Sequence, residues 1–132
     1  MSATAITPYL SVDDAKAAIE WYGAVFGATV VEGEFYQEGD RIGHASLKIG
    51  SADLYVSDEY PELGAESPAR LGGTTVAVVL HVDDVDGVWQ AAVDAGATPD
   101  RPPADQMDFR SCWFRDPWGH RWSAMGAQPS AE

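Results

Sequence analysis

The sequence predicts an α+β fold made of two tandem modules, each with the order strand–helix–strand–strand–strand. Three observations lead to this prediction. The stretch SVDDAKAAIEWYGAVFGAT at 11–29 recurs in similar form as HVDDVDGVWQAAVDAGAT at 81–98. Within each copy the spacing of apolar residues changes from the period of a strand to that of a helix. Turn-forming residues then divide the rest of each half into short extended segments.

The two copies match position by position. Asp13 and Asp14 recur 70 residues later as Asp83 and Asp84, and the apolar residues before them recur with the same offset. By the Gly-Ala-Thr that ends each stretch the offset is 69, so the second copy has lost one residue. A fixed internal period is the signature of repeated architecture, and we interpret it as a duplication.

In the first copy, alternation predicts a strand with one buried apolar face, formed by Ile6, Pro8, Leu10 and Val12. A helix with one apolar stripe follows, formed by Ala15, Ala18, Ile19, Tyr22, Val25 and Phe26. Asp13 and Asp14 are suited to cap free N–H groups at the start of this helix, and Gly27 is suited to end it.

The second copy predicts the same two elements. Its strand face consists of Val76, Val78, Leu80 and Val82, and its helical stripe of Val85, Val88, Trp89, Ala92 and Ala95. Trp89 is therefore expected in the core rather than in a binding site.

Further strands are predicted at 28–36, 41–49 and 52–57, and at 97–100, 109–115 and 121–125. Asp116-Pro117-Trp118-Gly119 has the residues of a β-turn at the positions that a turn requires. We expect a single domain over 1–132, with module 1 at about 5–58, a surface linker at about 59–73, module 2 at about 74–126 and a C-terminal tail at 127–132.

The composition and net charge of the chain limit the kinds of partner that we expect. The chain has 132 residues, 45% of them hydrophobic, and a net charge of −13. This charge argues against nucleic acid as a partner and is compatible with a cationic ligand, although acidic surfaces also serve solubility. No apolar run is long enough to span a membrane, and no signal peptide is recognisable. The single Cys112 fits a reducing compartment, so a cytoplasmic location is expected.

Three segments carry a family resemblance: TPYLSVDDAKAAIEWYGAVFGA, RIGHASLKIG and FRDPWGHRWSAM. Together with the doubled module, they resemble the vicinal oxygen chelate superfamily of glyoxalases, bleomycin-resistance proteins and extradiol dioxygenases, and within it the PhnB-like branch. The resemblance covers residues 6–125. It implies a curved mixed sheet with a concave ligand cleft, and it implies a homodimer.

Metal-dependent members of this superfamily use two ligands from each module, usually His or Glu. The corresponding positions here are Thr7, Tyr55 (or Leu54, if the register differs by one), Ala77 and Ser123. None of these is an ordinary ligand for zinc, nickel or iron. The sequence therefore predicts no metal at the family position and no cofactor.

Alternation along the predicted strands places aromatic and polar residues on the face opposite the helices. We expect a ligand pocket lined by Tyr9, His44, Tyr55, His81, Phe109, Trp113, Trp118 and Arg121. The alternatives are that the three His residues are structural, and that Phe109 and Trp118 belong to the core or to a dimer interface. Cys112 is expected to be a buried, inert thiol. No catalytic grouping is recognisable.

Three functions compete. The first is a metal-independent protein that binds or sequesters a small aromatic or cationic compound, and the absent metal ligands and the aromatic face favour it. The second is a metal-dependent lyase, isomerase or dioxygenase with non-standard ligands. The third is an interaction domain that retains the fold without a ligand. An enzyme is thus not expected, but the sequence leaves the question open.

Overall fold

A computed structural model describes residues 1–129 of the chain, so the last three residues of the expected tail lie outside the description. The chain divides into two compact units, the first covering Met1–Gly72 and the second beginning at Gly73. The expected modules fall one in each unit.

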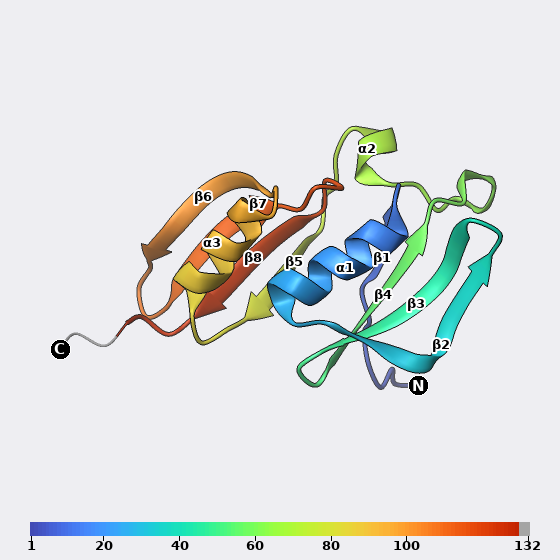
Figure 1. Cartoon of the computed structure of the whole chain (residues 1–132). Coiled ribbons are helices and arrows are strands. Elements are labelled where there is room, and N and C mark those ends of the chain that lie inside the picture. The colour runs from blue at the N-terminus through green and yellow to red at the C-terminus, as the bar shows by residue number, and fades with distance from the viewer. Residues whose placement is uncertain (130–132) are drawn as a thin grey trace. The chain divides into compact units, whose positions relative to one another are not determined.

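The first unit is a four-stranded mixed sheet with one long helix on it (Figure 1). Its main elements are β1 (Tyr9–Val12), α1 (Ala15–Phe26), β2 (Thr29–Glu38), β3 (Arg41–Ile49) and β4 (Ala52–Asp58). The strand order is β1-β4-β3-β2, in which β1 is parallel to β4 and the other neighbours are antiparallel.

The second unit repeats this topology. It consists of β5 (Ala77–His81), α3 (Val85–Asp94), β6 (Thr98–Asp105), β7 (Arg110–Arg115) and β8 (Arg121–Gly126). The strand order β5-β8-β7-β6, with β5 parallel to β8, matches the first unit strand for strand. The predicted α+β fold of two tandem βαβββ modules is therefore confirmed.

The repeated aspartates cap the helices as expected. The Asp14 carboxylate accepts a hydrogen bond from the N–H of Ala17 at 3.1 Å, and Asp84 accepts one from Gly87 at 2.9 Å. At the end of α1, Gly27 adopts a left-handed conformation with φ 73°, and its N–H bonds back to the last turn. These contacts satisfy backbone groups that a helix end leaves without partners.

Alternation sorts the residues of each sheet into a helix-covered face and an open face. In the first unit, α1 covers a core to which the strands contribute Leu10, Val12, Ala45, Leu47, Leu54 and Val56. The helix adds Ala15, Ala18, Trp21 and Tyr22 to this core. Trp21 was not among the predicted stripe residues, although its ring packs edge-on against Tyr22 and Phe26. Its flat side chain reaches the core from the edge of the stripe.

Three predicted core residues are exposed. Ile6 and Val76, the first residue of each predicted strand face, have relative exposures of 94% and 68%. The reason is that β1 begins only at Tyr9 and β5 only at Ala77, so both residues precede the hydrogen-bonded ladder. Ala95, predicted in the second helical stripe, is also exposed, since it lies at the cap where α3 ends. Trp89 is half-buried and packs against Phe114, with 6.5 Å between ring centroids.

Strand β6 is longer than predicted. The prediction ended at Asp100, whereas the strand continues through Pro102 and Pro103 to Asp105. Proline cannot donate to a ladder and is tolerated in edge strands, and β6 lies at the edge of its sheet. The extra residues place Arg101 opposite Trp113 of β7.

The segment expected as a surface linker contains a 3₁₀ helix, η1 (Pro61–Leu63), and a short helix, α2 (Pro68–Leu71). The Glu59 carboxylate holds this segment in place by accepting hydrogen bonds from the N–H of Ser67 at 2.9 Å and from Arg70 Nε at 3.0 Å. Ser67 and Pro68 are buried. This stretch therefore folds as part of the first unit.

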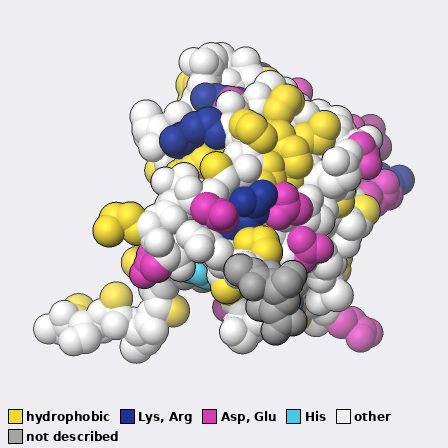
Figure 2. Space-filling model, turned by 90° about the vertical axis from the view of Figure 1, so that its left-hand side faces the viewer, with side chains coloured by type: hydrophobic (Ala, Val, Ile, Leu, Met, Phe, Trp, Pro, Cys, Tyr) yellow, Lys and Arg dark blue, Asp and Glu magenta, His cyan; other side chains and the backbone are white. Residues whose placement is uncertain are grey.

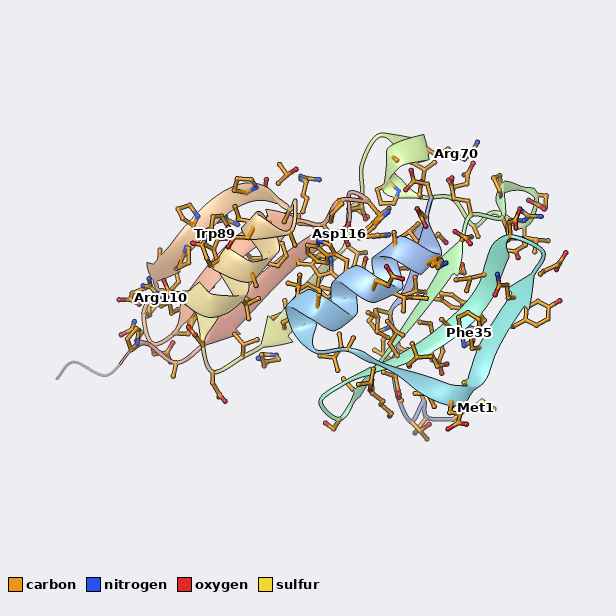
Figure 3. All side chains as sticks on the ribbon, viewed as in Figure 1. Met1, Phe35, Arg70, Trp89, Arg110 and Asp116 are labelled. Atoms are coloured by element: carbon orange, nitrogen blue, oxygen red, sulfur yellow. The ribbon has the colours of Figure 1, made fainter. Side chains whose placement is uncertain are left out.

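The predicted turn after β7 is present, with the N–H of Gly119 bonded to the carbonyl of Asp116 at 3.0 Å. The Asp116 side chain is buried and accepts three N–H groups: the backbone N–H of Trp118, the backbone N–H of His120 and the indole Nε1 of Trp122. Trp122 itself is fully buried. The turn and the core of the second unit are thus joined by one carboxylate, labelled in Figure 3.

Candidate functional site

Three predicted site residues come together on the open face of the first unit. Tyr9 of β1 pairs with Tyr55 of β4, and the next strand brings His44 alongside. The ring centroids of Tyr9 and His44 lie 5.4 Å apart, those of Tyr9 and Tyr55 5.4 Å, and those of His44 and Tyr55 4.8 Å, all edge-on. We call these three residues the aromatic triad. Tyr9 is 52% exposed, so the triad is accessible from solvent.

A chain of hydrogen bonds runs through the triad. The Tyr9 hydroxyl lies 2.7 Å from His44 Nδ1, and His44 Nε2 lies 2.8 Å from the hydroxyl of Ser46. The Tyr9 hydroxyl also has the carbonyl of Gly43 at 3.3 Å. Because hydroxyls both donate and accept, either neutral tautomer of His44 finds partners at both nitrogens. The ring orientation is thus fixed while the position of its proton remains free to change.

Ser46 was not predicted as a site residue. It shares the open face with His44, two positions further along β3, and is 2% exposed. Its spacing from His44 on a strand could have identified it, because residues two apart face the same side.

A third phenol, that of Tyr60, lies close to the triad. Within residues 1–129, the hydroxyl of Tyr60 is buried without a hydrogen bond. A methyl group placed on Gly43 would lie 3.3 Å from this hydroxyl, which shows how close Tyr60 comes to the backbone below the triad. Burial raises the pKa of both Tyr9 and Tyr60 above the ordinary value for tyrosine.

The open face of the second unit carries a different cluster. The guanidinium of Arg121 lies over the Trp113 ring at 4.3 Å from its centroid, and that of Arg101 at 4.8 Å. Trp113 lies opposite the helix-facing residues of its strand, Cys112 and Phe114, both fully buried. Cys112 is therefore the buried thiol that the sequence predicts, and burial raises its pKa. Arg101 was missed because the sequence did not place it in a strand.

The remaining predicted residues are not drawn into either cluster. His81 is exposed at the last position of β5, four residues beyond Ala77, which pairs with Arg121. Phe109 precedes β7, whereas Trp118 lies in the turn after it, so these two aromatics are at opposite ends of the strand. Their part in ligand binding stays a prediction.

The four family metal positions do not offer a ligand set. Thr7 precedes β1, and the Tyr55 ring packs in the triad. Ala77 has no donor, and the Ser123 hydroxyl is buried and donates to the carbonyl of Cys112 at 3.0 Å. Across residues 1–129, no group of three or more His, Cys, Asp or Glu is arranged to hold a metal ion. The donor chemistry at these positions therefore does not fit the metal of the metal-dependent relatives.

A hollow of about 320 Å³ lies elsewhere in the first unit and includes none of the predicted site residues. Carboxylates dominate its lining, which consists of Asp13, Asp14, Lys16, Asp40, Arg41, Asp58 and Glu59. Several of these already have structural roles. For example, Asp58 accepts the N–H of Ala15 at 2.8 Å and that of Ile42 at 2.7 Å, which ties the start of α1 to β3. The carboxylates of Asp14 and Asp58 in this lining are thus already engaged at the start of α1.

Elsewhere on the surface, basic and acidic side chains are interleaved, and Figure 2 shows one basic group flanked by acidic ones. Arg110 is an example, since it contacts Asp86 of α3 at 2.9 Å and Asp105 of β6 at 3.0 Å. None of the helices in residues 1–129 is long and apolar enough to cross a membrane.

The doubled βαβββ topology, with an aromatic and polar open face on each sheet, is that of glyoxalase-type proteins. Comparison with protein families agrees, since residues 4–124 match the Glyoxalase/Bleomycin resistance protein/Dioxygenase superfamily. The chain belongs to this superfamily.

Its relatives include an uncharacterized protein of Mycobacterium bovis, 38% identical over 123 residues, which cover 90% of this chain and 80% of the relative. An uncharacterized protein of Mycobacterium tuberculosis is equally similar, with 72% of its length covered.

Similar solved structures include TioX from Micromonospora, with 25% identity and a TM-score of 0.71 over 98% of this chain and all of the other. The fosfomycin resistance protein FosX from Mesorhizobium loti has 18% identity and a TM-score of 0.68, over 97% and 94% of the two chains. A likeness at the level of FosX shows the shared fold alone.

Proposed function

We propose that this chain binds a small aromatic or cationic compound on the open face of its first unit, and that it does so without a metal at the family position. The observation that carries the proposal is the aromatic triad of Tyr9, His44 and Tyr55. These rings offer faces for stacking or for a cation, and the phenol and imidazole offer polar anchors. Small-molecule sites combine apolar surface with a few fixed polar groups in this way.

The hydrogen bonds of His44 also support the binding proposal. A ring that is held at both nitrogens, as His44 is by Tyr9 and Ser46, loses little freedom when a ligand arrives. Preorganisation of this kind strengthens binding because less entropy is lost on association. Partial exposure of Tyr9 leaves a surface for the ligand to cover.

Neutral 1-naphthol and cationic 1-naphthylmethylammonium are suitable probes, followed through the NMR signals of the His44 imidazole. At least one of them should shift these signals saturably, and Tyr9→Leu and Tyr55→Leu should each weaken its binding about ten-fold, the scale of losing an aromatic contact. Phe35→Leu is the matched control. Phe35 is exposed on β2, labelled in Figure 3, and pairs with Ala45 on the helix-covered side. Equal loss in the control, or no saturable shift with either probe, would refute the proposal.

The competing reading is a metal-dependent enzyme with non-standard ligands. The donor chemistry at Thr7, Tyr55, Ala77 and Ser123 is the reason to prefer metal-independent binding. Elemental analysis of protein purified without chelator decides between the two. Stoichiometric zinc, nickel or iron that is lost from an Ala variant at a ligating residue would establish the enzyme reading.

We also propose that the chain falls in the PhnB-like branch of its superfamily, that it acts in the cytoplasm and that it forms a homodimer. The first rests on the segments TPYLSVDDAKAAIEWYGAVFGA and FRDPWGHRWSAM, and the second on the lone buried Cys112. Light scattering at micromolar concentration should give about twice the chain mass, because exposed apolar residues such as Val30 and Phe35 leave surface for a partner to cover. A monomer under these conditions would exclude the homodimer.

A further inference from the structure

Arginines with no acidic partner gather at one place in a strongly acidic chain. The sequence has eight Lys and Arg against 21 Asp and Glu, so a carboxylate partner is easy to find. Arg41, Lys48, Arg70, Arg110 and Arg115 each form an ion pair with one. Within residues 1–129, Arg101 and Arg121 do not, and both lie over the ring of Trp113.

The surroundings of Trp113 keep this charge uncompensated. Arg115 pairs in register with Arg121, which brings a third guanidinium to the same end of the face. Asp100 is adjacent to Arg101 in the sequence, but its carboxylate lies 3.5 Å from Arg115. The other neighbours on this face are neutral: Ala77 and Val79 of β5, and Ser123, whose hydroxyl already bonds to a carbonyl.

We propose that Arg101, Trp113 and Arg121 form a binding site for a small planar compound with a carboxylate or a similar anionic group. Two guanidiniums at one ring repel each other, and an anion between them replaces this repulsion by two attractions. Arginine offers planar paired donors that match a carboxylate, and charge-assisted bonds of this type are strong. The half-buried indole offers a surface for the apolar part of the same ligand.

The second unit alone supplies these three residues, and none of them belongs to the site proposed for the first unit. The local charge around Trp113 is positive, whereas the net charge of the chain is −13. The overall field draws in cations, and the cluster around Trp113 selects against them. The two proposals can therefore fail separately.

The test uses the full chain labelled with ¹⁵N and follows the indole N–H signal of Trp113, assigned by its loss in Trp113→Phe. The probe 1-naphthoate should shift this signal saturably, and 1-naphthylmethylammonium should not. Arg101→Gln and Arg121→Gln should each raise the dissociation constant for 1-naphthoate about ten-fold, as expected for the loss of one charge-assisted hydrogen bond. Both variants keep a long polar side chain, and thermal melts establish that they are folded.

Arg70→Gln is the matched control, because Arg70 is an exposed arginine of the first unit with a carboxylate partner. It should leave the affinity for 1-naphthoate unchanged. Three results would overturn the proposal: equal binding of the cationic probe at Trp113, unchanged affinity for 1-naphthoate in both Gln variants, or no saturable shift. Any of them would mean that the two arginines only pack on the indole.

Discussion

The carboxylate of Asp116 accepts a hydrogen bond of 2.9 Å from the indole nitrogen of Trp122, and both groups are buried. The other oxygen of Asp116 accepts two backbone N–H groups of the following turn, each at 3.0 Å. One charged side chain thus accepts hydrogen bonds from the turn and from a core tryptophan of the second unit.

We expect Asp116→Ala to lower the free energy of unfolding by about 3 kcal/mol, because it removes the carboxylate that accepts from the buried indole of Trp122 and from two N–H groups of the turn. Asp116→Asn should cost less, since the amide oxygen still accepts. Urea denaturation followed by Trp fluorescence measures both. The exposed Asp108 of the same unit serves as the control, and Asp108→Ala should change stability by less than about 0.5 kcal/mol. Equal effects of the two Ala substitutions would contradict this role for Asp116.

Arg110 makes the second unit sensitive to acid. Its guanidinium contacts both oxygens of Asp86 at 2.9 Å and holds the pKa of that carboxyl below its ordinary value of 3.8. A carboxyl whose pKa is lower in the folded state stabilises the fold above its ordinary pKa, and this contribution is lost as pH falls through the folded value. Arg110 lies at the opposite end of β7 from Asp116, as Figure 3 shows.

The melting temperature of Arg110→Gln should therefore fall short of that of the unmodified chain near pH 7, and the gap should close below about pH 4. Added salt should narrow the gap as well, because the carboxylates are about half exposed. Asp86→Asn in the Arg110→Gln background should add little, since the partner is already absent. A gap that is independent of pH would show that Arg110 acts through packing.

Tyr60→Phe should leave the free energy of unfolding unchanged or raise it by about 1 kcal/mol. The hydroxyl that it removes is buried without a partner among residues 1–129, and such a group costs desolvation free energy in the folded state. The stacking of Arg41 over the ring, at 4.1 Å, is retained. Tyr36→Phe on the exposed β2 is the control and should be neutral. A clear loss of stability in Tyr60→Phe would reveal a partner for its hydroxyl.

Tyr9 and Tyr60 should lose their hydroxyl protons at a higher pH than an ordinary tyrosine does. Burial raises the pKa of both above 10.0, so the unfolded chain releases these protons first. Their contribution to stability is therefore present at neutral pH and is lost as pH rises from about 10 through the folded values. An NMR titration of the tyrosine ring carbons should show late transitions for Tyr9 and Tyr60, each assigned by its loss in Tyr9→Phe or Tyr60→Phe. A transition of either ring at or below pH 10 would be the opposite result.

Much of the fold follows from the sequence because local signals agree. The aspartate caps, the helical stripes and the Asp116-Pro117 turn are each specified within a few residues. The starts of β1 and β5 were predicted too early. The apolar alternation already includes Ile6 and Val76, but the pairing with a neighbouring strand begins only after these residues. Alternation also assigned Tyr9, His44 and Tyr55 to one face. It could not show that they touch, because this depends on the parallel pairing of β1 with β4.

The position of Arg101, in contrast, could not be predicted from local signals. The prolines that follow it disfavour a strand, and the strand is tolerated only because β6 lies at the edge of its sheet. The pairing of Arg101 with Trp113 thus depends on strand order, which no local pattern contains.

The prolines of β6 also limit how this protein can associate. An edge strand offers unpaired N–H and carbonyl groups to which another chain can add a strand, and Pro99, Pro102 and Pro103 remove donors from this one. One edge of the first sheet is protected differently, since β2 carries Glu32, Glu34 and Glu38, and two copies of it would bring like charges together. Growth of a continuous intermolecular sheet, and with it amyloid-like stacking, is therefore disfavoured at both β6 and β2.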